Sequence, residues 1–181
     1  MEANEDKKTG IKLRLLLLVI AIIAAVFAIL YKGDTFGKDE DDILNDEIAA
    51  LGEREYTGTL VTAEEYPVIV GMVYKKEDYS DARWFAYVQN KHLPDKWILK
   101  GSGELKEENG LICLDCVGYG RGFVALNKNR SIAKIVYTDG TIPYVEDNID
   151  YPIVCLDTDV AGGVHFYDKD DNEASVIMMV L

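Results

Sequence analysis

The chain has 181 residues, of which 49% are hydrophobic, and its 32 acidic side chains outnumber 19 basic ones, giving a formal net charge of −13 at pH 7. Because proteins bind nucleic acid through Lys and Arg side chains that neutralise phosphates, this balance excludes nucleic acid as an expected partner. Residues 33–181, about 149 in number, are enough for one domain with one hydrophobic core.

The first predicted element is an apolar helix. Leu15 to Tyr31 read LLLLVIAIIAAVFAILY, without a charged side chain. At about 1.5 Å of rise per residue this stretch spans roughly 25 Å, and counting from Ile11, with Lys12 and Arg14 snorkelling outward, extends it to about 31 Å. The sequence therefore predicts a transmembrane helix over 15–31, with the lipid bilayer as its partner.

The charges that flank this helix predict its orientation. Lys7, Lys8, Lys12 and Arg14 precede it, whereas Lys32 alone follows it closely. Under the positive-inside rule, residues 1–14 form a cytoplasmic tail and the remainder is extracytoplasmic. Up to residue 32 there are five basic and three acidic residues, so the exported part keeps 19 − 5 = 14 basic and 32 − 3 = 29 acidic residues, a formal charge of −15.

A cleaved signal peptide is the alternative for this segment. Residues 7–14 would be its basic region, and Val26-Phe27-Ala28 is an acceptable cleavage site. The apolar run, however, is longer than the roughly 7 to 15 residues usual in signal peptides. We therefore expect an uncleaved signal-anchor in the cell membrane.

Residues 32–55 are predicted to form an acidic stalk and a short helix. The stalk, 33–42, reads GDTFGKDEDD, a polar and charge-dense composition. Leu44, Ile48 and Leu51 then recur at helical spacing, with Asp41 or Asp42 as N-cap and Gly52 after the last apolar position. Because an isolated helix of this length is marginal in water, we expect its apolar stripe to dock on the domain.

From residue 56 to 181 the sequence predicts a β-rich domain. Short runs rich in Val, Ile, Tyr and Thr alternate with turn residues. Asp139-Gly140 favours a type I′ hairpin and 168–173 a looser turn, and no helix long enough for a βαβ crossover intervenes. We expect an antiparallel β-sandwich or curved sheets, with strands at 56–62, 67–74, 82–89, 96–100, 111–117, 122–126, 132–138, 141–145, 151–156, 163–167 and 174–180.

Several motifs follow one another between residues 59 and 173: TLVTAEE, VIVGMVY, RWFAYVQ, DKWILKGSG, SIAKIVYTDGT and VHFYDKDDNE. In this order they resemble a group of uncharacterised small proteins of Gram-positive bacteria that carry an N-terminal membrane anchor and one exported β domain. In that group the last motif has glycine where this chain has Asp171. The resemblance implies a surface β domain and brings no activity and no site residues with it.

The cysteines are the sharpest chemical candidates. Cys113 and Cys116 form a C-x-x-C motif, but a redox dithiol needs a lowered thiolate pKa, and this segment is predicted as a strand, in which residues i and i+3 face opposite sides. Three states stay open: buried free thiols, a disulfide between Cys155 and either Cys113 or Cys116, and an envelope thiol–disulfide oxidoreductase that uses Cys113 and Cys116. A zinc site of the three thiols with His165 would lack a second closely spaced ligand pair.

A calcium site is the other metal alternative. Asp168, Asp170 and Asn172 repeat the opening of an EF-hand loop, but Glu173 stands where the loop needs glycine and Met179 where it needs a bidentate Glu. We therefore expect a turn here, with a weak calcium site as the alternative, and we expect no cofactor.

The glycine-rich segment 118–122 lacks the spacing of a phosphate-binding loop and precedes no predicted helix, so it is interpreted as a bend between strands. Arg121 within it could pair with an acidic group of a partner. His92 and His165 are not spaced to serve a nucleophile, which disfavours a hydrolase. The 11 tyrosines, with Trp84 and Trp97, could form a carbohydrate- or peptide-binding face on one sheet.

Together these patterns predict a single-pass protein of a bacterial cell envelope whose exported β domain is not an enzyme. We expect it to bind or sense an unknown protein, peptide or glycan. The two alternatives are the thiol–disulfide oxidoreductase and a structural accessory subunit of a membrane complex.

Overall fold

The computed structural model describes residues 14–26, 36–63, 66–138, 143–147, 149, 152–157 and 163–181. The predicted cytoplasmic tail up to residue 13, residues 27–31 of the predicted transmembrane helix, stalk residues 33–35 and the Asp139-Gly140 turn lie outside the described residues. A helix spans 14–26, α2 spans Glu40–Ala49 and the 3₁₀ helix η1 spans Glu107–Asn109. The strands are β1 Tyr56–Ala63, β2 Tyr66–Lys75, β3 Arg83–Gln89, β4 Trp97–Glu104, β5 Leu111–Cys116, β6 Gly120–Ala125, β7 Lys134–Thr138, β8 Pro143–Asp147, β9 Ile153–Asp157, β10 Gly163–Tyr167 and β11 Val176–Val180.

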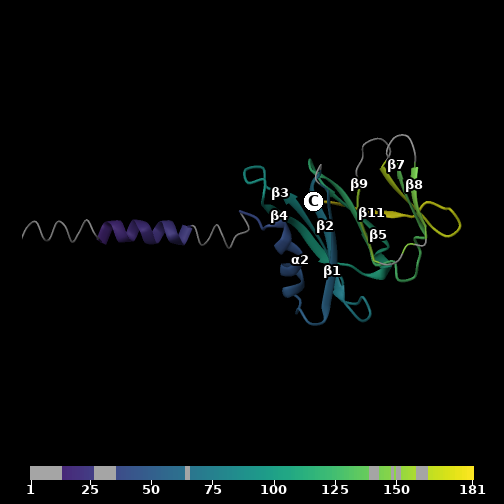
Figure 1. The fold of residues 1–181 in the computed structure, drawn as a ribbon, viewed down its shortest axis with the longest axis horizontal. Coiled ribbons are helices and arrows are strands. Elements are labelled where there is room, and N and C mark those ends of the chain that lie inside the picture. The colour runs from purple at the N-terminus through teal and green to yellow at the C-terminus, as the bar shows by residue number, and fades with distance from the viewer. Residues whose placement is uncertain are drawn as a thin grey trace, which may run out of the picture.

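The mainly-β fold is confirmed, and every predicted strand segment overlaps an observed strand. The strands form three sheets, in the orders β1-β2-β3-β4, β11-β5-β6-β9 and β10-β7-β8. Here they are called the first, middle and outer sheet. Figure 1 shows α2 against the first sheet and β7 and β8 at the far side of the domain. The domain is therefore layered as helix, sheet, sheet, sheet.

The main core lies between the first and the middle sheet. Val70 and Met72 of β2 and Trp84 of β3 meet Leu114 of β5 and Val124 of β6, all of them buried. Residues that alternate with these face the opposite side of each sheet, because successive side chains in a strand point to opposite faces. Both faces of β2 and β3 are covered, which explains why these strands read as continuous apolar runs.

A second core lies between the middle and the outer sheet. Phe123 of β6 packs against Phe166 of β10 with ring centroids 4.9 Å apart, and Ile135 of β7 is buried in the same cluster. This outer layer is thin, since every residue of β8 is exposed.

The third core confirms that the short helix docks on the domain. Ile43 of α2 is fully buried against the first sheet, and Ile48 packs beside it. Glu47 accepts a hydrogen bond of 2.6 Å from the hydroxyl of Tyr87, which fixes α2 to β3. Sequence patterning missed Ile43, the most buried residue of the helix.

The predicted helix ends need correction. The N-cap is Asp39, not Asp41 or Asp42, because Lys38 is held by a backbone bridge to Trp97 and the helix begins directly afterwards. At the other end, the C-cap is Ala50, so Leu51 and Gly52 lie beyond the helix.

The same bridge shortens the predicted stalk. Lys38 exchanges two backbone hydrogen bonds of 2.8 Å with Trp97, and its side chain forms an ion pair of 2.9 Å with Asp46. Residues 38–42 therefore belong to the folded domain rather than to a solvated stalk. The chain enters the domain at the end of the first sheet that holds the β3–β4 loop.

Strand pairing differs from the prediction in one place. β11 runs parallel to β5, as the one exception to antiparallel pairing among the described strands. β7 and β8 pair antiparallel, with Thr138 opposite Pro143.

β4 is longer than predicted because two glycines make room for a ring. A Cβ atom on Gly103 would lie 2.9 Å from Nε1 of Trp84, and one on Gly101 would lie 3.3 Å from the same ring. The strand therefore continues through Gly101 and Gly103, where the composition alone indicated its end.

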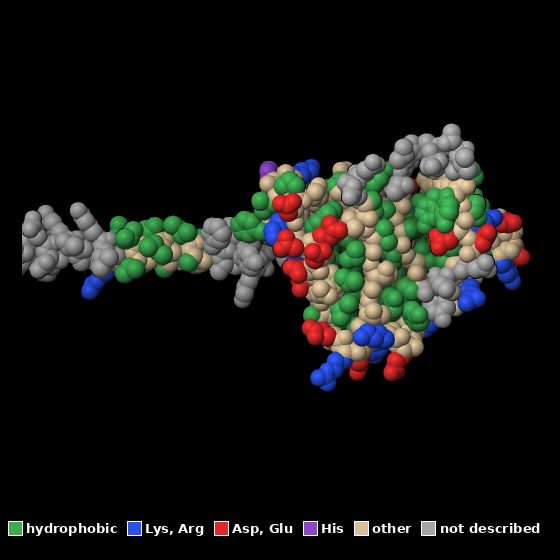
Figure 2. Space-filling model, in the orientation of Figure 1, with side chains coloured by type: hydrophobic (Ala, Val, Ile, Leu, Met, Phe, Trp, Pro, Cys, Tyr) green, Lys and Arg blue, Asp and Glu red, His purple; other side chains and the backbone are tan. Residues whose placement is uncertain are grey.

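The helix over residues 14–26 carries apolar side chains all round, and each of its described residues is exposed. Figure 2 shows hydrophobic side chains along it. Among the described residues, no helix combines the length and the apolar composition that a membrane crossing requires.

Candidate functional site

The structure separates the three cysteines. In β5, Cys113 faces the core under the outer sheet, whereas Cys116 faces the core under the first sheet. Cys155 of β9 shares a core with Cys113. Phe123 of β6 lies between them, however, because it is opposite Cys113 in the β5–β6 pair and opposite Cys155 in the β6–β9 pair. Two strand spacings put the Cα atoms of Cys113 and Cys155 about 9 to 10 Å apart, beyond the roughly 7 Å limit of a disulfide.

All three thiols are free and buried, so the structure contains neither predicted disulfide. Burial raises the pKa of Cys113 and of Cys116 to about 11, and that of Cys155 to about 12. A redox dithiol needs two sulfurs in reach of each other and a lowered thiolate pKa. Cys113 and Cys116 have neither property, and the geometry favours three inert core thiols.

The zinc and calcium alternatives are not assembled. His165 of β10 lies with Nδ1 3.2 Å from Oε1 of Glu173, away from the thiols. In the 168–173 turn, Asp168 accepts hydrogen bonds from the backbone of Asp170 and from the backbone and side chain of Asn172. In the part of the chain that the structure describes, no cluster of three metal-ligating side chains occurs.

These contacts make 168–173 a closed turn, as expected. The hydrogen bonds from Asn172 hold the pKa of Asp168 below its usual value. Asp171 adopts φ of 61°, in the left-handed region that favours glycine.

The glycine-rich segment 118–122 is the turn between β5 and β6 and the start of β6. The ring of Tyr119 is covered by the ammonium groups of Lys91 and Lys100, at 5.2 and 5.5 Å. Arg121 lies opposite Asp157 in the β6–β9 ladder, with a guanidinium nitrogen 3.5 Å from the carboxylate. Arg121 thus has an acidic group within its own domain.

The predicted aromatic face is not formed by the tryptophans. Trp84 and Trp97 are buried at 4% and 7% exposure, as core residues of the first sheet. Among the described aromatic side chains, Tyr144 of β8 is the one with a large exposed fraction, 66%. It lies beside Tyr137, with ring centroids 6.0 Å apart.

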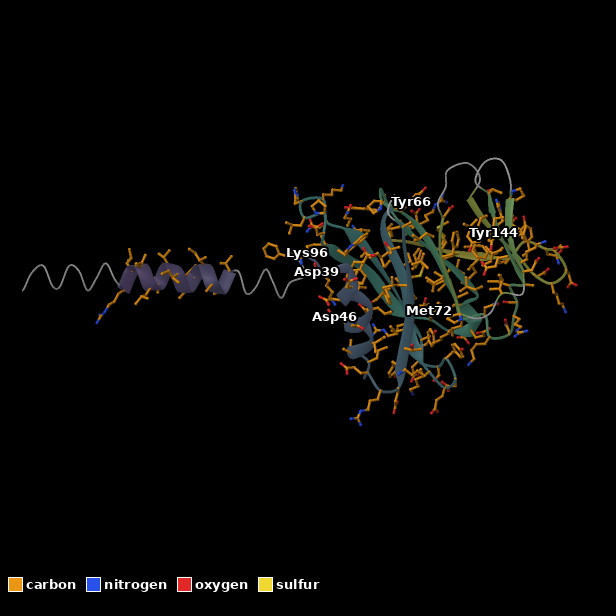
Figure 3. The ribbon with its side chains drawn as sticks, in the orientation of Figure 1. Asp39, Asp46, Tyr66, Met72, Lys96 and Tyr144 are labelled. Carbon is orange, nitrogen blue, oxygen red and sulfur yellow. The ribbon has the colours of Figure 1, made fainter. Side chains whose placement is uncertain are left out.

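A groove of about 760 Å³ crosses the end of the first sheet where the chain enters the domain. It is formed by the start of α2, the ends of β1 and β3, the start of β2 and the β3–β4 loop. Its lining residues are Glu40, Thr62, Ala63, Tyr66, Pro67, Gln89, Pro94, Asp95 and Trp97. Tyr66, labelled in Figure 3, is half-buried at its rim.

The chemistry of the groove is aromatic and acidic. Among its described lining residues, Glu40 and Asp95 carry the charge and none is basic. Lys96 lies next to it, but its ammonium contacts both carboxylate oxygens of Asp39 at 2.8 Å, and Figure 3 shows the two side by side. Such a groove can accommodate a cationic group next to an apolar one.

Sequence reasoning missed this groove, because its residues come from several separate elements. The signal that could have indicated it is the pair of prolines, Pro67 and Pro94, each close to a strand start. Comparisons of the chain with protein-family models, with curated proteins and with solved structures find no match.

Proposed function

We propose that the protein is a single-pass, membrane-anchored binding module whose β domain lies on the extracytoplasmic side of a bacterial cell envelope. The observation that carries this proposal is the helix over 14–26, which beyond Arg14 is apolar on every side and is exposed along its whole described length. Burying such a helix in lipid removes the cost of exposing it to water. The sequence continues the apolar run to Tyr31.

We propose the groove at the chain-entry end of the domain as the binding site. It combines Tyr66, two prolines and two carboxylates, in a domain of strongly negative charge. These properties support a partner segment that places a Lys or Arg side chain beside an apolar one, and a peptide meets this requirement better than a neutral glycan. Binding of this kind weakens as salt rises, because salt screens charge attraction.

The anchoring part is tested with protease on intact spheroplasts that express the full chain. We expect loss of the β domain with retention of a short N-terminal fragment. Full resistance of the domain, with digestion only after lysis, would place it in the cytoplasm and refute the proposed topology.

The binding part is tested with a photo-crosslinking amino acid at residue 66 of the full chain in cells. The matched control carries the same amino acid at residue 144, the exposed tyrosine of β8 at the other side of the domain (Figure 3). We expect a discrete crosslinked species from position 66 that disappears when Glu40 and Asp95 are both changed to Lys. Equal products from both positions, or products insensitive to that charge reversal, would contradict the assignment of the groove.

A further inference from the structure

The edges of the three sheets differ in how they are protected. β8 carries Pro143, Glu146 and Asp147, and β4 carries Lys100 and Glu104. β1 and β9, the neighbouring edges of the first and middle sheets, pack against each other. Charges, prolines and covering elements are the usual ways in which proteins prevent an edge strand from pairing with another chain.

Among the described residues, β11 has none of these protections. Its sequence, VIMMV, contains no charge, proline or glycine, and its register with β5 is regular. Val176, Ile177, Met178 and Val180 are 42%, 48%, 53% and 67% exposed, in a strand that is apolar on both faces. Outside the helix over 14–26, no other described element exposes four large apolar side chains.

The backbone of β11 also has an open side. Leu181 donates to the carbonyl of Asp115 at 2.9 Å and accepts from the amide of Val117 at 3.4 Å, so its polar groups point toward β5. Along a strand, the backbone N–H and C=O groups of successive residues point alternately toward one neighbouring strand and away from it. Val176, Met178 and Val180 therefore turn their N–H and C=O groups toward the edge, where none of the described strands pairs with them.

We propose that β11 is a self-association strand, which pairs antiparallel with β11 of a second copy about a two-fold axis at Met178. This goes beyond the proposed binding site, which lies on the first sheet. In this register Met178 faces Met178 of the second copy, and Val176 faces its Val180. Val176, Met178 and Val180 are the residues whose backbone N–H and C=O groups face the open edge. Each donor therefore lies opposite an acceptor of the second copy, and the pairing forms about six backbone hydrogen bonds.

A second copy fits this edge better than a charged partner does. β11 is uncharged along its length, so pairing of two copies buries no unpaired charge, and each strand supplies the same outward pattern that the other needs. Two methionines at the centre can adjust their shape to each other. If both copies are anchored in one membrane, confinement raises their effective concentration.

The charge of the domain gives this association a distinctive salt dependence. Two strongly acidic domains repel each other, and salt screens that repulsion. Self-association through β11 is therefore expected to strengthen as salt rises, whereas binding of a cationic segment in the groove weakens. The failure of one proposal is in this way distinguishable from the failure of the other.

Register-specific crosslinking of the full chain in its membrane tests the proposal. The native thiols are buried, so Met178→Cys adds one accessible thiol. Paired Cα atoms at position 178 would lie about 5.5 Å apart, within the range of a disulfide, whereas the Cα atom of Val176→Cys would lie about 14 Å from that of its symmetry mate. On mild oxidation we expect Met178→Cys to form dimers at least about fivefold faster than Val176→Cys, and Val176→Cys to crosslink to Val180→Cys when the two are co-expressed.

A charge substitution supplies the second arm. Met178→Lys places two ammonium groups opposite each other at the two-fold axis, and we expect it to weaken dimerisation about tenfold or more in detergent. Tyr144→Lys, a change at an exposed residue of β8, is expected to leave dimerisation unchanged. Equal crosslinking of Val176→Cys, Met178→Cys and a Tyr144→Cys control would overturn the proposal, and so would a dimer that survives Met178→Lys. Both results are expected if the N-terminal helix alone holds the dimer together.

Discussion

The close approach of the first two sheets at Gly122 leads to a quantitative prediction. A Cβ atom on Gly122 of β6 would lie 2.3 Å from Cγ2 and 2.9 Å from Cβ of Val70, in the main core. Ordinary carbon contacts are about 3.5 to 4.0 Å, so Gly122→Ala must move one sheet by about 1 Å or rotate Val70 away from a stiff rotamer. We expect a loss of about 2 to 3 kcal/mol in the free energy of unfolding.

A double-mutant cycle separates this clash from other effects. Val70→Ala alone removes buried methyl groups and costs about 2 to 3 kcal/mol. In the double variant the alanine methyl at 122 loses its closest contact, Cγ2 of Val70, whereas Cβ of residue 70 stays 2.9 Å away. Part of the clash is therefore relieved, and we expect a coupling of about 1 kcal/mol between the two substitutions. Gly118→Ala is the matched control, because its Cβ would meet nothing within 4 Å and only its φ of +80° is unfavourable.

Urea unfolding of the full chain in detergent, followed by the fluorescence of Trp84 and Trp97, measures these differences. Both tryptophans are buried in the first sheet and report on the domain. If Gly122→Ala lies within about 0.5 kcal/mol of the wild type, or if the two substitutions add, the sheets do not meet as described. Rescue of Gly118→Ala by Val70→Ala would contradict it as well.

The buried, high-pKa thiols should resist alkylation near neutral pH and react fully after denaturation, and rapid labelling of the native protein would restore the redox hypothesis. Ile43→Ala should destabilise the docking of α2 by about 2 to 4 kcal/mol, seen as faster hydrogen exchange in that helix, while Asn45→Ala on the exposed face stays within about 0.5 kcal/mol. Asp171→Gly should raise stability by up to about 1 kcal/mol, because the residue has a left-handed φ and its ion pair is exposed; an unchanged or lower melting temperature refutes this. The lowered pKa of Asp168, caused by Asn172, means that its contribution is present at neutral pH and is lost as pH falls below the usual value near 3.8; acid titration of Asp168→Asn should lack this component.

Local pattern was sufficient to locate the secondary structure. The strand at 163–167 was predicted with its observed bounds, and the helix before the β domain was found from three apolar residues at helical spacing. Alternation also showed that Cys113 and Cys116 face opposite sides of one strand. Period, turn residues and propensity act within a few residues of the chain, so the sequence carries them directly.

The sequence did not determine which strands become neighbours or how many layers form. The parallel pairing of β11 with β5 joins segments about 65 residues apart, and its register depends on core packing rather than on a turn. Long-range pairing also inserts Phe123 between Cys113 and Cys155, brings the separate elements of the groove together and leaves β11 at an edge. Buried strands such as β2 are apolar on both faces, so their side chains show that a strand is covered but not by which element; only the packed tertiary structure decides that.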